Sequence, residues 1–140
     1  MAIIELGGAG GWNISGGRAT GGSAAVELTP IEKWLEIEIG TTLLFARHSA
    51  EWSADALFKK PWTLSRKTEI MVGIGPELVH TREFGTTRNS LAGEIALDFM
   101  YWPGARHRLG WFIEPAFEYT FGHIHERSIG ITSGLIIAIP

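Results

Sequence analysis

The segment SLAGEIALDFMYW, residues 90–102, alternates between two kinds of side chain. Its odd-numbered residues 91–101 are mostly bulky and apolar, whereas its even-numbered residues 92–100 are mostly small or polar and include Glu94 and Asp98. A period of two is typical of a β-strand, because successive side chains of a strand point to opposite faces. The segment therefore predicts a strand with one apolar face and one acidic face.

Seven further segments have the same alternation, at residues 3–13, 23–29, 34–46, 51–60, 67–80, 108–121 and 127–139. We expect Pro61 to end the fourth strand and TREFGTTRN, residues 81–89, to form a polar loop. The short connections favour antiparallel neighbours, and closing an even number of strands into a barrel leaves no open edge. We predict one all-β domain, residues 1–140: an eight-stranded antiparallel up-and-down β-barrel.

The distribution of charge and side-chain size indicates which face is inside. Glutamates and aspartates lie within the strands beside Gly, Ala and Thr, whereas Lys and Arg gather near strand ends and in loops. Small residues suit the narrow interior of a small barrel, and a soluble surface usually mixes both signs of charge. We therefore interpret the barrel as the transmembrane type, with its apolar face toward lipid. The alternative is a soluble barrel that binds a hydrophobic ligand inside.

The aromatic residues form two belts about ten residues apart along the strands, as expected for membrane strands of about 9–11 residues. Tryptophan and tyrosine prefer the headgroup zone, because their rings are apolar and their polar tips need water. The predicted partner is thus a lipid bilayer, and the predicted location is the bacterial outer membrane. The predicted membrane-interface aromatics are Trp12, Trp34, Trp52, Trp62, Tyr101, Trp102, Trp111 and Tyr119.

The bulk composition excludes several other classes of function. The formal net charge of −3 gives no reason to expect nucleic-acid binding, and the absence of cysteine excludes disulfides and thiolate metal sites. The opening residues, MAIIELGGAGG, lack the basic start and long apolar core of a signal peptide, so we expect none in this chain.

Carboxylates inside a barrel need partners, because burial without compensation disfavours their charged form. Alternation places three basic residues on the inner face near one end of the barrel, within reach of several acids. We predict a salt-bridged lumen network there, with a structural role. The network consists of Glu36, Glu69, Asp98, Glu114, Lys59, Lys67 and Arg108.

Two other patterns resemble functional sites but lack required groups. His123 and His125 share one face of an extended stretch, yet no third metal ligand accompanies them. Ser128 and Ser133 lie near these histidines in sequence, but no strand carries a compact His-x-Ser pair of the kind that hydrolysis would need. We therefore predict no metal, no cofactor and no enzymatic activity.

Six stretches carry a resemblance that covers nearly the whole chain: VELTPIEKWLEIEIG, EWSADALFKKPW, EIMVGIGPELVHT, AGEIALDFMYWP, GWFIEPAFEYTFG and GITSGLIIAIP. They resemble a group of uncharacterised small proteobacterial proteins with a predicted outer-membrane β-barrel. LFKKPW and SGLIIAIP are the most distinctive strings. The resemblance implies a barrel and an envelope location, and it assigns no catalytic or binding residues.

Two hypotheses about function follow for a membrane barrel. The first is a structural or surface-interaction role for a barrel with an acidic, salt-bridged lumen. The second is a narrow channel or transporter that passes cations or small solutes. The first is favoured, because the side chains of an eight-stranded barrel usually fill its interior.

Overall fold

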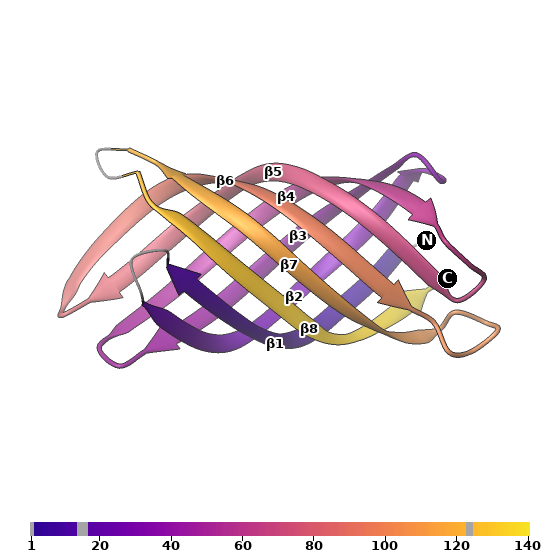
Figure 1. Ribbon diagram of the computed structural model, residues 1–140, viewed down its shortest axis with the longest axis horizontal. Helices are drawn as coiled ribbons and strands as arrows, with labels where there is room; N and C mark the ends of the chain where they lie inside the picture. The colour runs from indigo at the N-terminus through magenta and orange to yellow at the C-terminus, as the bar shows by residue number, and fades with distance from the viewer. Residues whose placement is uncertain (1, 14–16, 123–124) are drawn as a thin grey trace.

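The structure is a computed structural model that describes residues 2–13, 17–122 and 125–140. The described residues form eight strands: β1 (Ala2–Asn13), β2 (Arg18–Ile31), β3 (Leu35–Ala46), β4 (Ser49–Thr63), β5 (Thr68–Glu83), β6 (Thr86–Tyr101), β7 (Leu109–Phe121) and β8 (Arg127–Ile139). Each strand pairs antiparallel with the next, and β8 pairs with β1, which closes the barrel (Figure 1). The predicted eight-stranded up-and-down barrel is confirmed. None of the described residues lies in a helix long and apolar enough to cross a membrane.

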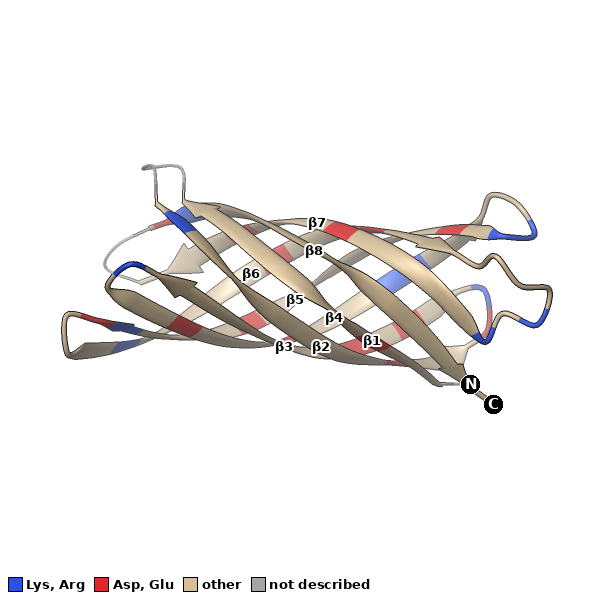
Figure 2. Ribbon diagram, turned by 90° about the horizontal axis from the view of Figure 1, so that it is seen from below, with Lys and Arg blue, Asp and Glu red and all other residues tan. Residues whose placement is uncertain are grey.

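The barrel has two distinct ends. The terminus end holds both chain termini and the β2–β3, β4–β5 and β6–β7 connections (Figure 1). The far end is where β1, β3, β5 and β7 finish. Most Lys and Arg residues lie at these two ends, whereas Asp and Glu also occur along the strands between them (Figure 2).

The prediction that Pro61 ends the fourth strand is wrong, because β4 continues to Thr63 and Pro61 pairs with Met71 of β5. Pairing between β3 and β4 stops at Glu36 and Lys59. Pro61 thus lies beyond the β3 ladder, where its missing N–H breaks no hydrogen bond on that side.

The predicted polar loop at residues 81–89 is also wrong, since β5 and β6 pair as far as Glu83 and Thr86. Only Phe84 and Gly85 remain in the turn, with φ of 49° and 78°. Positive φ at both central residues is typical of the type I′ turn, whose twist matches that of the flanking strands. Polar side chains at residues 81–89 therefore extend a hairpin instead of ending it.

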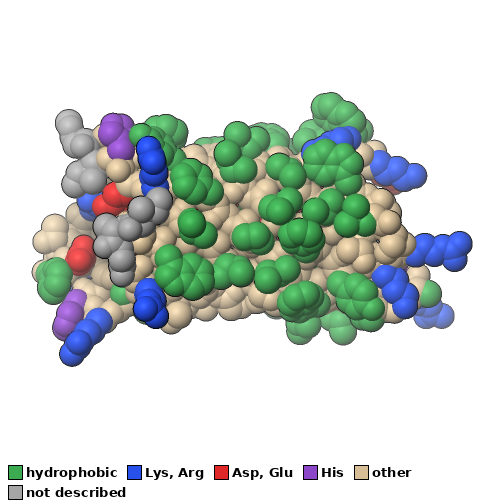
Figure 3. Space-filling model, viewed as in Figure 1, with side chains coloured by type: hydrophobic (Ala, Val, Ile, Leu, Met, Phe, Trp, Pro, Cys, Tyr) green, Lys and Arg blue, Asp and Glu red, His purple; other side chains and the backbone are tan. Residues whose placement is uncertain are grey.

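The outer surface of the barrel is apolar along its middle (Figure 3). Large hydrophobic side chains on successive strands are exposed there, including Ile39 at 61%, Ile74 at 61% and Leu78 at 60%. The residues that alternate with them point inward, and these include Glu38, Glu77 and the small residues around them. The predicted outward apolar face is therefore the observed one.

The lumen at the terminus end is filled by an apolar cluster, which we call the plug. Its members are buried side chains from five strands and the β6–β7 connection: Ile3, Met71, Met100, Trp102, Phe112 and Ile136. The acidic residues of the lumen begin directly beyond the plug. Along β6, Met100 belongs to the plug, whereas Asp98 and then Glu94 are the next buried charged residues toward the far end.

Candidate functional site: the acidic lumen

A single lysine forms the centre of the charged lumen. Lys59 of β4 is 1% exposed, and its ammonium group contacts carboxylates from four other strands. The distance from Nζ is 2.6 Å to Glu114 Oε2, 3.2 Å to Glu27 Oε1 and 3.2 Å to Asp98 Oδ2. Lys59 also donates to Glu38 Oε2. We call these five residues the Lys59 network.

Strand register brings the acids of the Lys59 network together. Glu27 of β2 and Glu38 of β3 are directly opposite each other, an arrangement of like charges that is destabilising by itself. Lys59 Nζ lies within salt-bridge distance of both carboxylates and offsets this repulsion. A lysine ammonium offers three N–H donors, which allows several carboxylates to share it.

Gly73 leaves the space that the Lys59 side chain occupies. Gly73 of β5 is directly opposite Lys59, and a Cβ built on it would lie 2.8 Å from Lys59 Cγ. A side chain at this position would therefore force Lys59 or the backbone to shift. The glycine is thus part of the geometry that places the ammonium group at the centre of the lumen.

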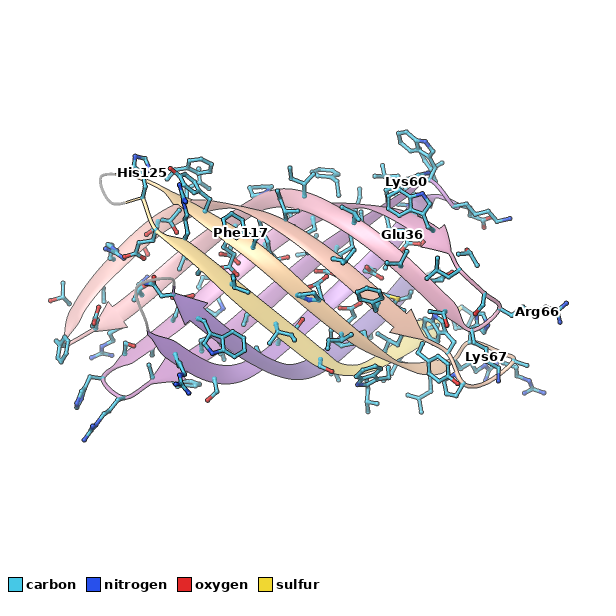
Figure 4. All side chains as sticks on the ribbon, in the orientation of Figure 1. Glu36, Lys60, Arg66, Lys67, Phe117 and His125 are labelled. Carbon is cyan, nitrogen blue, oxygen red and sulfur yellow. The ribbon has the colours of Figure 1, made fainter. Side chains whose placement is uncertain are left out.

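The structure brings together three of the seven residues of the predicted network: Lys59, Asp98 and Glu114. Glu36 is buried directly across from Lys59 on β3, and Glu69 is partly buried near the terminus end. Lys67 and Arg108 are exposed, and Figure 4 shows Lys67 at the terminus end of the barrel. In the described parts of the chain, neither Lys67 nor Arg108 forms a salt bridge with an acid.

Lys67 and Arg108 are in connections, directly before β5 and β7 at the terminus end, where both residues are exposed and the barrel wall no longer encloses their side chains. The prediction also missed Glu27 and Glu38, although both lie within strands, as the predicted acids Asp98 and Glu114 do. Pairing of Glu27 with Glu38 depends on the β2–β3 register, which a bulge between Leu28 and Ile31 shifts.

A cavity of about 300 Å³ occupies the lumen on the far-end side of the Lys59 network. Its lining includes the acids Glu5, Asp55, Glu77, Glu94 and Glu118, and Glu38 and Glu114 of the Lys59 network also line it. Residues near the strand ends, such as Asn13, Glu83 and Arg88, also line it, so it opens toward the far end. No member of the plug contributes to its wall.

Six of the eight predicted interface aromatics are exposed on the outer surface: Trp12, Trp34, Trp52, Trp62, Tyr101 and Trp111. Tyr119 is partly buried and packs edge-on against Phe121. Trp102 is a correction, because it is 2% exposed, belongs to the plug and stacks on His107. Alternation along β6 would have placed Trp102 inside, with Asp98 and Met100.

The histidine and serine residues considered above lie in separate environments. His123 is outside the described residues, and His125 stacks on Tyr119 at the far end (Figure 4). Ser128 Oγ donates a hydrogen bond to Glu118 Oε2, and Ser133 Oγ donates one to the Phe112 carbonyl oxygen. Both hydroxyl groups are therefore engaged with lumen or backbone acceptors.

The whole chain is similar in structure to small outer-membrane barrels. Neisserial surface protein A superposes with a TM-score of 0.76 over 99% of this chain and 96% of that chain, at 10% identity. The N-terminal β-barrel domain of Pseudomonas aeruginosa OprF gives a TM-score of 0.65 over 97% of each chain, at 13% identity. The outer membrane enzyme PagL gives 0.62 over 99% of this chain and 100% of that chain, at 9% identity.

At these levels of sequence identity, the similarity establishes the fold alone. Because PagL is an enzyme, the fold is compatible with catalysis. No family model and no curated protein matches the sequence.

Proposed function

We propose that the protein is a bacterial outer-membrane barrel with a structural or surface-interaction role, whose lumen is a one-ended acidic chamber. It acts without a catalytic site. The observation that carries this proposal is the combination of an apolar outer band with a lumen that is filled at the terminus end.

The outer band supports contact with lipid. Exposed apolar side chains surround the middle of the barrel, and charged side chains are concentrated at its two ends (Figure 3). An apolar surface of this extent is rare on monomeric soluble proteins, whereas a lipid-facing band flanked by aromatic residues is typical of outer-membrane barrels. A soluble barrel with a hydrophobic ligand inside would need the opposite arrangement, and the inner face here carries the acids.

The filled lumen supports a structural role over a channel. A conducting path would have to pass both the Lys59 network and the plug, where Lys59, Met100 and Phe112 are each about 1% exposed. The acidic cavity is the observation that favours the second candidate, cation transport, because it would attract cations from the far end. Without an outlet at the terminus end, such cations would bind and leave by the same opening.

Conductance in a planar lipid bilayer tests the proposal. After insertion has been verified by protection from protease in matched vesicles, we expect no ion current above that of protein-free bilayers. Discrete cation-selective openings of the wild-type protein would contradict the closed lumen and support the channel. A protein that stays folded in buffer and does not insert would contradict the membrane assignment.

A further inference from the structure

We propose that Asp55, Glu77 and Glu94 form a calcium-binding site inside the lumen. These side chains come from β4, β5 and β6 and line the acidic cavity on the far-end side of the Lys59 network. The proposed structural role does not include this site. The site does not depend on whether the barrel lies in a membrane.

The three carboxyl groups converge at one level of the barrel. Asp55 and Glu77 are directly opposite each other on β4 and β5, and Glu94 lies opposite Gly75, two residues along β5 from Glu77. One oxygen from each carboxyl group lies within 4.8 Å of the other two. Ligands that bind one ion at about 2.4 Å can be up to about 4.8 Å apart, so a single Ca²⁺ fits among these oxygens.

Each of these three side chains has a buried oxygen atom without a partner among the described residues. Glu77 is 4% exposed and Glu94 is 6% exposed, and both line the cavity. Glu77 Oε1, Glu94 Oε2 and Asp55 Oδ2 are buried and receive no hydrogen bond from the residues that the structure describes. Such atoms normally have a partner, since an unsatisfied buried carboxylate oxygen is costly.

The Lys59 network shows how this lumen compensates a comparable group of acids. Four carboxylates surround the ammonium group of Lys59. Across residues 2–13, 17–122 and 125–140, no lysine or arginine forms a salt bridge with Asp55, Glu77 or Glu94. A bound cation would supply these three acids with the positive charge that Lys59 supplies to the four acids of the Lys59 network.

The donor set and the preferred geometry of each ion favour calcium over other metals. All three donors are carboxylate oxygens, which hard cations prefer and which lack the nitrogen or sulfur that selects zinc or copper. Magnesium requires near-ideal octahedral geometry at about 2.0–2.1 Å and usually keeps several waters, whereas Ca²⁺ accepts irregular geometry at about 2.3–2.6 Å. Water in the cavity and Glu118, which is directly opposite Glu94, can complete the coordination of the ion.

Calcium binding to the purified, folded barrel tests the site. The protein is refolded in detergent micelles, treated with a chelator, dialysed and titrated with CaCl₂ at neutral pH by calorimetry. We expect one Ca²⁺ per chain and a higher melting temperature with Ca²⁺ than with the same concentration of Mg²⁺. The double variant Glu77→Gln/Glu94→Gln should weaken binding at least tenfold.

Glu69→Gln is the matched control, because it removes one lumen acid outside this group and should bind Ca²⁺ as the wild type does. Asp55→Asn provides a second variant if the double variant does not fold, and it should also weaken binding. The proposal is overturned if the wild type binds no Ca²⁺ up to about 10 mM, above the Kd of the weakest calcium modules, about 1 mM. Equal binding by the wild type and the folded Glu77→Gln/Glu94→Gln variant would also overturn it, since the ion would then lie elsewhere.

Discussion

The ammonium nitrogen of Lys59 lies 2.6 Å from Glu114 Oε2, although 55 residues separate these two residues in the chain. Both side chains point into the lumen, from β4 and β7, and both are buried. The contact therefore joins strands that are not neighbours in the barrel wall. It links opposite parts of the wall through the interior, in addition to the hydrogen bonds between adjacent strands.

Replacement of Lys59 with methionine should strongly destabilise the barrel. Four buried carboxylates would lose their shared cation, and breaking a buried ion pair by removing one partner typically costs about 3–5 kcal/mol. Urea unfolding of the refolded protein in lipid vesicles measures the loss. Lys60→Met is the control: among the described residues, the ammonium group of Lys60 donates to the Lys33 carbonyl oxygen and lies over the Trp34 ring, so its loss should cost about 0.5–1 kcal/mol. Equal losses for the two variants would contradict the central role of Lys59.

Gly73→Ala should weaken the same network without changing any charge. The new Cβ would lie 2.8 Å from Lys59 Cγ, so the lysine must shift, and overpacking of this kind costs about 1–3 kcal/mol. Gly93→Ala is the matched change on the outer face, where the nearest side-chain atom would be 3.4 Å away. The same urea titration compares the two variants, and a Gly73→Ala protein as stable as Gly93→Ala would show that Lys59 does not need this space.

The surroundings of Lys59 illustrate what the sequence could and could not predict. Alternation alone predicted the strands, the closed barrel and the inward direction of Lys59, Asp98 and Glu114. It could not predict that Gly73 lies opposite Lys59, or that Glu27 meets Glu38, because these pairs depend on register. Register in turn depends on turn geometry and bulges, such as the one between Leu28 and Ile31.

The site predictions that were wrong concern residues just outside the strands. Trp102 has the same parity as Asp98, and it lies inside the barrel with the plug and not in the aromatic belt. Lys67 and Arg108 lie directly before β5 and β7 at the terminus end, where both residues are exposed.

Trp102→Ala should destabilise the barrel more than truncation of an aromatic residue on the outer surface. Trp102 is almost fully buried against the plug, and deletion of a buried tryptophan side chain typically costs about 3–5 kcal/mol. Trp111→Ala is the comparison, because 47% of the Trp111 side chain is already exposed. Thermal unfolding in micelles measures both variants, and a larger loss for Trp111→Ala would contradict the assignment of Trp102 to the interior.

Ile95→Lys should destabilise the protein in lipid by about 2–4 kcal/mol, the cost of a lysine near the middle of a bilayer. Ile95 is 52% exposed at the middle of β6, so the same change would be nearly neutral if water surrounded the barrel. Leu64→Lys is the control in the β4–β5 connection, where a lysine would reach water. Unfolding in vesicles compares the two, and a neutral Ile95→Lys variant would mean that the outer face does not contact lipid.

The most direct test of the membrane assignment is tryptophan fluorescence in liposomes with and without lipids that carry quenchers on their acyl chains. Five of the six tryptophans are exposed on the outer surface, and Trp102 is the buried one. We therefore expect strong quenching of the wild-type protein. A variant that keeps only Trp102, with the other five replaced by phenylalanine, should be quenched much less. Unquenched wild-type fluorescence, with the protein folded and free in buffer, would contradict a lipid-facing outer surface and with it the assignment of this barrel to a membrane.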